Sequence, residues 1–406
     1  MSSTSQPGAT VGTGNPGTTT IPMPPTQTAC PPAGTARAAV IRPLARGRDA
    51  TIVYRKGPFG ETFVRYDVVT HQKTTILSLN VGGELSQAQL SSDGQWLLFV
   101  APQGKGQDYY NAIQMLRLDG QGLQTLYCSP ATAGLSIMGM QWSLDDKTVI
   151  FSQGFVAEPP SYTVFVMDIS KGIVQQELVK PASMMGFFAA TWLDQTHVYL
   201  VRSDASGYPQ ALFLLDTTRG SQQNVNQLTL IRSPVPIGTF WSFDTSIDGS
   251  TIYTAQYQQP DVATSEGPST ISVQPATGGQ PKTIYTDQMH AITDVRIMTR
   301  SLLAYVVDNH NSADTSENGL WMMYTDGTRP TRLTTSLNTG LNPYSQYTWS
   351  NFSRDGSMYA VEIDDGQRSA LIFGSLTGSG PQTTLESESD SLVPGEIYTM
   401  VGWTTL

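Results

Sequence analysis

Residues 89–99 read QLSSDGQWLLF, and this stretch decides the fold. A short strand runs into a Ser-x-Asp-Gly turn, and an apolar strand follows the turn. Aspartate and serine accept hydrogen bonds from nearby backbone N–H groups, and glycine adopts the positive φ that a tight hairpin requires. The stretch therefore predicts a β-hairpin.

The same pattern recurs along the chain, at intervals of roughly 50 residues. Later copies contain Trp142, Trp192, Thr245, Ile297 and Phe352 at the position of Leu90. The copy after Ile297 has lost its Asp-Gly turn, because Thr299 and Arg300 replace it. A second, outer hairpin lies between successive copies. The first outer hairpin begins with the strand 63–67, and the last begins with the strand 371–373. A period of this length is typical of propellers and other repeat arrays.

The two ends of the repeat region supply a missing hairpin. Residues 398–403 (YTMVGW) match an inner strand that has no partner, and residues 50–54 (ATIVY) match a second strand that has no inner strand. Pairing them would leave only short, protected edges. The sequence therefore predicts an all-β, seven-bladed β-propeller over residues 49–406. Its blades are four-stranded and antiparallel, and its ring is closed by pairing the N- and C-terminal strands.

The Ser-x-Asp-Gly copies, with the outer Asp-Gly hairpin of residues 320–335, resemble the TolB-type (WD-like) β-propeller repeat. The resemblance covers about residues 49–406 and is least clear around Thr299. It implies a bacterial, envelope-associated propeller that recognises other proteins. Peptidases with a similar propeller add an α/β-hydrolase domain with a Gly-x-Ser-x-Gly motif, which this sequence does not contain. The fold alone does not define an activity.

The composition excludes some classes of partner. The formal net charge is -10, which disfavours nucleic acid and anionic membranes as partners. Charged residues make up 14%, below the usual share of about a quarter, and the polarity comes from Ser, Thr, Gln and Asn instead. No apolar stretch is long enough to span a bilayer. We expect a secreted or cell-envelope protein.

Residues 1–35 are rich in Ser, Thr, Gly and Pro, and we expect a disordered linker there, followed by a connector over residues 36–48. The linker has no apolar core of a signal peptide. Our hypothesis is that Met1 replaces a processed signal or a lipid-modified cysteine, so that a lipid anchor could lie upstream. Cys30 and Cys128 fit no zinc pattern. They either pair and fix the tail to the propeller, or remain two free thiols.

The two faces of the predicted ring differ in their residues. The Ser-x-Asp-Gly turns lie on one face, where we expect Asp93, Asp248 and Asp355 to form turns rather than bind ligands. The loops of the opposite face contain aromatic and charged residues, which are typical binding anchors. The alternative for these residues is ordinary loop polarity. The predicted binding residues are Tyr109, Tyr110, Tyr208, His290, Asp308, His310, Tyr344, Tyr347, Asp364 and Arg368.

Two parts of the sequence contain side chains that can bind metal ions. The segment 308–317 is rich in oxygen ligands but lacks the order and the glycine of an EF-hand loop, so calcium is only an option there. His290, Asp308 and His310 could together bind a divalent metal in an enzyme. No Ser/His/Asp or Cys/His arrangement stands out, and Cys128 has no candidate base nearby. We therefore predict no cofactor and no catalytic residue.

These observations favour a non-enzymatic, envelope-displayed or secreted propeller that binds protein or carbohydrate through its loop-rich face. The alternative is a propeller hydrolase or lyase that acts on a saccharide or lactone with a metal in the central channel. The sequence leaves open the identity of the partner and the oligomeric state.

Overall fold

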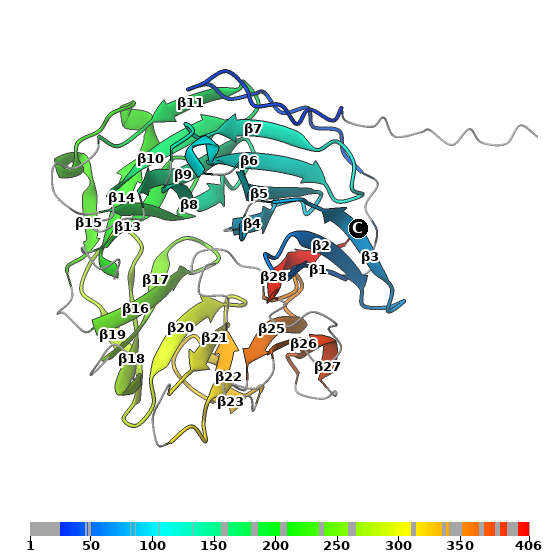
Figure 1. Ribbon diagram of the computed structural model, residues 1–406. Helices are drawn as coiled ribbons and strands as arrows, with labels where there is room; N and C mark the ends of the chain where they lie inside the picture. The colour runs from blue at the N-terminus through cyan, green and yellow to red at the C-terminus, as the bar shows by residue number, and fades with distance from the viewer. Residues whose placement is uncertain are drawn as a thin grey trace, which may run out of the picture.

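The computed structural model of the chain contains seven four-stranded antiparallel sheets, arranged as blades around a common axis (Figure 1). The sheets confirm the predicted seven-bladed β-propeller. The structure describes residues 25–44, 47, 50–81, 83–85, 87–104, 106–132, 134–155, 161–179, 186–203, 209–234, 239–258, 265–309, 314–334, 338–340, 351–364, 369–377, 382–387 and 397–405. Within this part of the chain, no helix is long and apolar enough to cross a membrane.

Each blade runs from an inner strand beside the axis to an outer strand, and blades 1 to 6 follow one another along the chain. Blade 1 has β4 (Gln87–Leu90), β5 (Trp96–Gln103), β6 (Tyr110–Arg117) and β7 (Gln124–Cys128). Blade 2 has β8 (Leu135–Trp142), β9 (Thr148–Phe155), β10 (Ser161–Asp168) and β11 (Ile173–Gln176). Blade 3 has β12 (Phe187–Trp192), β13 (His197–Ser203), β14 (Pro209–Asp216) and β15 (Thr229–Arg232).

The next three blades repeat this arrangement. Blade 4 has β16 (Thr239–Thr245), β17 (Thr251–Gln258), β18 (Glu266–Pro275) and β19 (Lys282–Asp287). Blade 5 has β20 (Ile292–Ile297), β21 (Leu302–Val307), β22 (Gly319–Tyr324) and β23 (Thr331–Arg332). Blade 6 has β24 (Asn338–Gly340), β25 (Met358–Asp364), β26 (Ser369–Ser375) and β27 (Thr383–Ser387). Three short 3₁₀ turns, 106–108, 217–219 and 225–227, lie in connections.

Blade 7 is built from both ends of the repeat region. Its inner strand is β28 (Ile397–Thr404), followed by β1 (Thr51–Gly57), β2 (Thr62–Asp67) and β3 (Lys73–Ser78). Ile52 lies opposite Trp403, as the sequence predicted. The closing blade also contacts blade 6 through a carboxylate: the Tyr54 hydroxyl donates to Glu386, and Lys73 Nζ lies 3.0 Å from Glu386 Oε1.

The hydrophobic core lies between neighbouring blades. Trp96 and Leu98 of blade 1 share one buried cluster with Trp142 and Phe151 of blade 2. Because side chains alternate along a strand, each blade buries apolar residues on both of its faces, and only its edges remain polar. A ring of blades therefore buries the apolar faces without needing an additional domain.

The inner hairpins are closed by a repeated network of hydrogen bonds. Ser91 Oγ donates to Asp93 Oδ1 over 2.6 Å and accepts from the Trp96 backbone N–H over 3.0 Å. The same bonds recur in the pairs Ser143–Asp145, Ser246–Asp248 and Ser353–Asp355. Asp93, Asp248 and Asp355 are therefore turn formers, as predicted.

The N-terminal strap, residues 25–44, lies along the outer edge of blade 1. We expected residues 25–35 to belong to a flexible linker, but the structure places them against β7, where the Gln27 N–H donates to the Leu123 carbonyl and the Thr125 N–H donates to the Gln27 carbonyl. The strap turns at 31–35 and returns, with Ala36 beside Tyr127. Cys30 and Cys128 form a disulfide, which decides between the two alternatives left open by the sequence.

Polar side chains hold the two legs of the strap. Arg37 donates to the carbonyls of Gln27 and Ala29, which ties one leg to the other. The buried Gln124 side chain accepts from the Val40 N–H over 2.8 Å and donates to the Val40 carbonyl over 3.1 Å. These contacts explain why a Gly- and Pro-rich segment with little apolar surface is ordered.

Candidate functional site at the turn face

The ring has two faces. The connections between first and second strands, and between third and fourth strands, form the turn face; the other connections form the loop face. A cavity of about 290 Å³ lies at the turn-face ends of the inner strands. Blades 1, 2, 3, 6 and 7 contribute residues to it. They are Gln89, Leu90, Ser91, Ser92, Gln141, Trp142, Ser143, Leu144, Asp146, Thr191, Trp192, Phe352, Arg354, Val401, Gly402 and Trp403.

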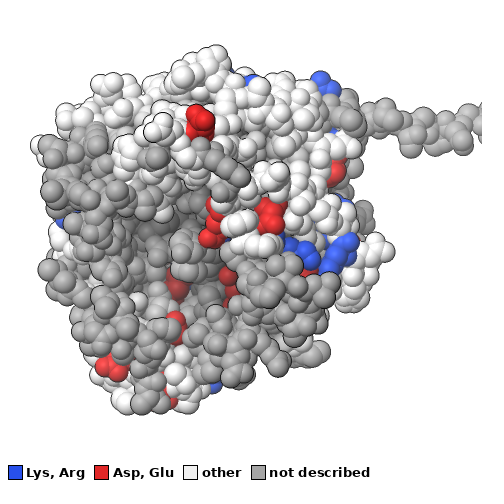
Figure 2. Space-filling view, viewed as in Figure 1, with Lys and Arg blue, Asp and Glu red and all other residues white. Residues whose placement is uncertain are grey.

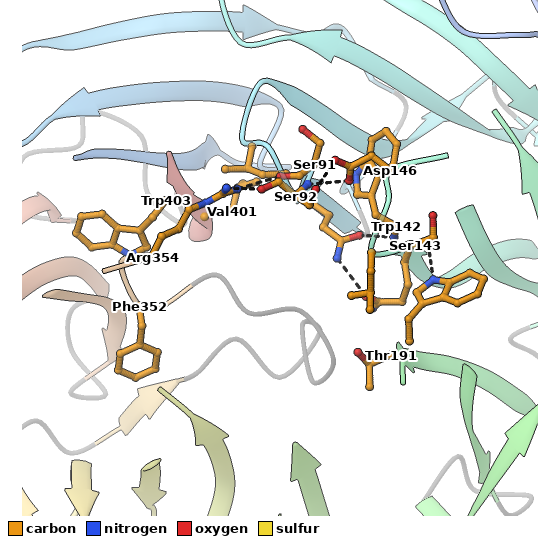
Figure 3. Close-up of a pocket in the computed structure, with 16 residues that line it drawn as sticks. Ser91, Ser92, Trp142, Ser143, Asp146, Thr191, Phe352, Arg354, Val401 and Trp403 are labelled. Atoms are coloured by element: carbon orange, nitrogen blue, oxygen red, sulfur yellow. Dashed lines mark hydrogen bonds between the residues drawn. The ribbon is translucent and has the colours of Figure 1, made fainter. Parts of the chain in front are cut away.

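Two groups of side chains face each other across this cavity. Figure 3 shows Phe352, Arg354 and Trp403 on one side, from blades 6 and 7. Trp142, Asp146 and other residues of blades 2 and 3 lie on the opposite side. The cavity therefore exists only when the ring is closed.

Equivalent positions of the repeat build the cavity. The residue two places before the first turn residue is polar or glycine in every copy, and we call these positions the inner ring: Gln89, Gln141, Thr191, Asp244, Arg296, Asn351 and Gly402. The next residue of each copy is mostly large and apolar, as in Trp142, Trp192 and Trp403, which are all buried. The tryptophans thus pack between blades, and four members of the inner ring line the cavity.

Side chains of one blade bind backbone N–H groups of the next inner strand. Gln89 Oε1 accepts from the Trp142 N–H over 2.9 Å, between blades 1 and 2. Asp244 Oδ2 accepts from the Ile297 N–H over 2.8 Å, between blades 4 and 5. These bonds satisfy N–H groups that have no strand partner on the axial side, which would otherwise be costly to bury.

A β-bulge in β8 places Gln141. Met138 lies opposite Ser152 and Gln141 opposite Ile150, so that Gly139 and Met140 together oppose one residue. Gly139 has φ of 58°, and a Cβ there would lie 2.4 Å from the Ala189 carbonyl oxygen. A bulge of this kind shifts the alternation of the strand by one residue, which changes the side that Gln141 faces.

Among the described residues that line the cavity, two are charged, and both bind the turn of blade 1. Arg354 donates to the carbonyls of Ser91 and Ser92, so its guanidinium bridges blades 6 and 1 across the end of β28. Asp146 accepts from the Ser92 N–H over 2.7 Å, and burial raises the pKa of its carboxyl. Because both charges serve the turn, the cavity offers mainly amide, hydroxyl and apolar groups.

Two acidic side chains with raised pKa values lie near the inner strands: Glu362 on the second strand of blade 6 and Asp294 on the inner strand of blade 5. Glu362 on β25 accepts from the Met400 N–H of β28 over 3.0 Å, and burial raises its pKa to about 7, against the opposing effects of that bond and of Arg55. Asp294 lies 3.0 Å from Arg296 Nη1, and burial raises its pKa despite this partner. Both carboxylates have a structural role: Glu362 joins blade 6 to blade 7, and Asp294 pairs with Arg296 of the same strand.

Most of the predicted binding residues cannot be compared with the structure. Tyr208, His310, Tyr344, Tyr347 and Arg368 lie outside the described residues, as does the side chain of Asp364 at the end of β25. Tyr109 directly precedes β6 and Tyr110 begins it, on the loop face of blade 1, where the Tyr109 hydroxyl is 3.5 Å from Asn111 Oδ1. His290 lies in the connection from blade 4 to blade 5, and Asp308 follows β21 of blade 5, so the described candidates do not form one cluster.

His290 has acidic neighbours other than those expected. Its Nδ1 lies 3.1 Å from Asp287 Oδ1, and its Nε2 lies 3.6 Å from Asp314 Oδ2. Asp308 instead accepts from Asn318 Nδ2 over 3.4 Å. Among the described residues, no three His, Cys, Asp or Glu side chains are placed to hold a metal ion. Calcium at 308–317, which includes residues outside this part, stays a prediction.

The residues that line the cavity were not singled out from the sequence. The signal was nevertheless present, because the position two residues before the turn is polar or glycine in all seven copies. Gln89, Gln141 and Thr191 could have been found by comparing this one position across the copies. Their direction could not, since it depends on the bulge at Gly139.

No protein-family model and no curated protein matches this chain. Solved structures do match it. One is an oligogalacturonate lyase in complex with manganese, with a TM-score of 0.56 and 12% identity, over 84% of this chain and 96% of that one. Another is the propeller domain of the trilobed protease from Pyrococcus furiosus, with a TM-score of 0.52 and 10% identity, over 88% of this chain and 100% of that one.

TolB from Acinetobacter baumannii is also among the matching structures, with a TM-score of 0.45 and 14% identity, over 88% of this chain and 68% of that one. At such identities the likeness is one of fold, because propellers support many unrelated activities. The matches with TM-scores above 0.5 and the seven blades agree with the β-propeller fold that the repeat predicted.

Proposed function

We propose that this propeller is a non-enzymatic binding protein that receives an extended segment of a partner protein in the turn-face cavity. The cavity carries the proposal. Its volume of about 290 Å³ is at the lower end of the range of ~300–1,000 Å³ that is usual for ligand sites, which suits a short segment rather than a folded domain. Residues from five blades meet there, and both apolar and hydrogen-bonding groups line it.

The rim of the cavity favours a protein partner. Leu144 lines the cavity at a turn tip and is 57% exposed. Ile247 occupies the equivalent turn position in blade 4 and is 60% exposed, but it does not line the cavity. Apolar side chains at exposed turn tips beside a cavity are typical of protein contact surfaces.

The distribution of charge opposes an anionic partner. The chain has a formal net charge of -10. Figure 2 shows that, among the described residues of the face in view, acidic side chains lie toward the middle and basic side chains gather mainly at one side. A polyanion would be repelled by the net negative charge of the chain. We therefore propose that nucleic acid is not a partner of this protein.

We also propose that the protein acts outside the cytoplasm, secreted or displayed on the cell envelope. The Cys30–Cys128 disulfide supports this, because disulfides form and persist in oxidising compartments. The polar, charge-poor composition and the TolB-type resemblance point the same way. The Ser-, Thr-, Gly- and Pro-rich composition of residues 1–24 suits a spacer between an anchor and the propeller.

The experiment compares the two faces. Linear peptides displayed on phage are selected against the wild-type protein, and the affinity of the best peptide is measured for variants. Leu144→Glu should weaken binding at least about tenfold, because a charge replaces an apolar side chain in the cavity wall. Ile247→Glu is the matched control, since it adds the same charge at the equivalent turn outside the cavity, and it should leave affinity unchanged.

A third variant tests the face predicted from the sequence. The double substitution Tyr109→Ala and Tyr110→Ala removes the two described tyrosines of the loop face. Loss of peptide binding in this variant, with binding kept in Leu144→Glu, would place the site on the loop face and overturn the proposal. Selection of no binding peptide at all would also count against a protein ligand.

A further inference from the structure

The direction of one side-chain amide in the cavity is fixed by the backbone. The Trp142 N–H can only donate, so the Gln89 atom 2.9 Å from it must be the oxygen. The other end of this amide, Gln89 Nε2, therefore faces Gln141 over 3.1 Å and donates to Gln141 Oε1. The backbone thus determines the orientation of two successive glutamine amides, which geometry alone often leaves undecided.

The last group of this relay is a donor. Gln141 is only 5% exposed and lines the cavity. Its oxygen is occupied by Gln89, and no described residue accepts a hydrogen bond from its Nε2. Turning the Gln141 amide around would bring two N–H groups together, so Nε2 must keep its N–H groups free. A nearly buried donor without an acceptor is costly unless a ligand or water supplies one.

The neighbours of Gln141 restrict the kind of acceptor. The Thr191 hydroxyl lies on the same side of the cavity (Figure 3) and can donate or accept. Arg354 and Asp146, the charged residues of the cavity, already bind the turn of blade 1. An anionic ligand would therefore find Arg354 already hydrogen-bonded and would be repelled by the Asp146 carboxylate. A cationic ligand would be repelled by the N–H groups of Gln141. An uncharged oxygen acceptor fits all of these groups.

We infer that Gln141 recognises the bound segment by donating its side-chain N–H to an uncharged carbonyl oxygen, either of the peptide backbone or of an Asn or Gln side chain. This inference rests on the proposed function and names the chemistry of that same site. Gln89 acts as a positioning residue, since it holds the Gln141 amide in the donating orientation.

The first test uses the peptide selected against the wild-type protein. Gln141→Glu keeps an oxygen for the Gln89 donor but replaces the cavity-facing N–H groups by an acceptor, so affinity should fall about tenfold. Gln87→Glu is the matched control. Gln87 accepts from the Met140 N–H over 2.7 Å in the same pair of blades and does not line the cavity, so its variant should bind within about twofold of wild type.

The outcomes separate the inference from the proposed function. If Leu144→Glu abolishes binding and Gln141→Glu does not, the segment enters the cavity but Gln141 does not read it, and only the inference fails. If neither variant changes the affinity, both fail. Gln141→Met, which is neutral and has no donor, must also weaken binding; an unchanged affinity in Gln141→Met would overturn the inference even if the glutamate variant misfolds.

The second test needs no selected peptide. The side-chain amide signal of Gln141 is identified in nitrogen-15 spectra of the full chain by its absence in Gln141→Met. N-acetylalanine methylamide, a neutral amide, should shift this signal, and acetate should not. A shift with acetate alone would contradict the uncharged acceptor, and a shift with methyl glucoside alone would indicate a saccharide site instead of a peptide site.

Discussion

At the scale of single residues, Gly139 determines the geometry of the cavity. Its positive φ creates the bulge that turns Gln141 toward the cavity, and the Ala189 carbonyl leaves no space for a Cβ. The positive φ and the contact with the Ala189 carbonyl both disfavour a Cβ at this position, so any residue larger than glycine would have to move the strand. The recognition chemistry of Gln141 therefore depends on a neighbour that has no side chain.

Gly139→Ala should lower the free energy of unfolding by about 2–4 kcal/mol, because positive φ and a steric clash add. It should also weaken binding of the selected peptide, since β8 must shift. Urea unfolding and peptide titration measure the two effects. Gly106→Ala is the control: Gly106 also has positive φ, of 60°, but a Cβ there meets nothing within 4 Å, so the cost should stay near 1 kcal/mol. Equal costs at both glycines would show that the Ala189 contact is unimportant.

Thr299 shows how far residue patterns alone can predict a turn. The sequence predicted a hairpin here despite the missing Asp-Gly, and the structure contains it, between β20 and β21. The Thr299 hydroxyl accepts from the Ser301 and Leu302 N–H groups over 3.2 and 3.1 Å, as the turn aspartates do elsewhere. A different side chain thus meets the same hydrogen-bonding demand, so the period of the repeat was a better guide than its consensus.

At the scale of elements, the strap was the largest departure from expectation. Its composition predicts a linker, since there is too little apolar surface to offset chain entropy. The strap is ordered instead by hydrogen bonds to the open edge of β7 and by the disulfide, which replace the missing apolar contacts. Neither could be deduced from the sequence, because pairing with an edge strand requires only backbone groups, which every residue has.

Cys30→Ser should lower the free energy of unfolding by about 2–4 kcal/mol, since the disulfide closes a loop of 98 residues in the unfolded chain. Hydrogen exchange should become faster first at the amides of Gln27 and Thr125, because their hydrogen bonds hold the strap to blade 1 and the disulfide no longer supports them. The Leu98 amide in the middle of blade 1 serves as the internal control and should keep its protection relative to global unfolding. Unchanged exchange at Gln27 would mean that hydrogen bonds alone hold the strap.

At the scale of the whole molecule, stability should depend on pH in two opposite ways. Hydrogen bonds from Ser246 and Ser250 lower the pKa of the Asp248 turn carboxyl to about 2, and similar bonds lower that of Asp355. A lowered folded-state pKa gives stability that is present above the unfolded value and is lost as pH falls through the folded value. The acid limb should therefore lie between about pH 4 and pH 2.

Two glutamates with raised pKa values act in the other direction. Burial raises the pKa of Glu362 to about 7, and burial also raises that of Glu177 to about 7, against an opposing hydrogen bond from Gln223. A raised folded-state pKa gives stability that is complete below the unfolded value, near 4.5, and is lost as pH rises through 7. The melting temperature should therefore be highest near pH 5.

Glu362→Gln tests this assignment, because glutamine keeps an oxygen for the Met400 N–H and cannot ionise. The variant should gain about 1–2 kcal/mol over wild type at pH 8 and little at pH 5. Thermal unfolding at both pH values measures the difference. Glu61→Gln is the control: Glu61 is a half-buried loop glutamate that accepts from the Phe59 N–H, so glutamine keeps this acceptor too, and the variant should behave as wild type. A gain of the same size at both pH values would assign the effect to packing instead of ionisation.

The closing blade has a consequence for how the chain reaches its final form. β1 leaves the ribosome first among the strands of the ring, yet its inner neighbour β28 is made last, and Arg354 and Thr404 bind the blade 1 turn only after that. Throughout synthesis β1 must wait with one edge unpaired, and such an edge invites pairing with other chains. If the chain crossed the membrane unfolded and the ring closed outside, the unpaired edge of β1 would not be exposed in the crowded cytoplasm. Cys30 and Cys128 would also stay reduced in the cytoplasm and could pair only outside it.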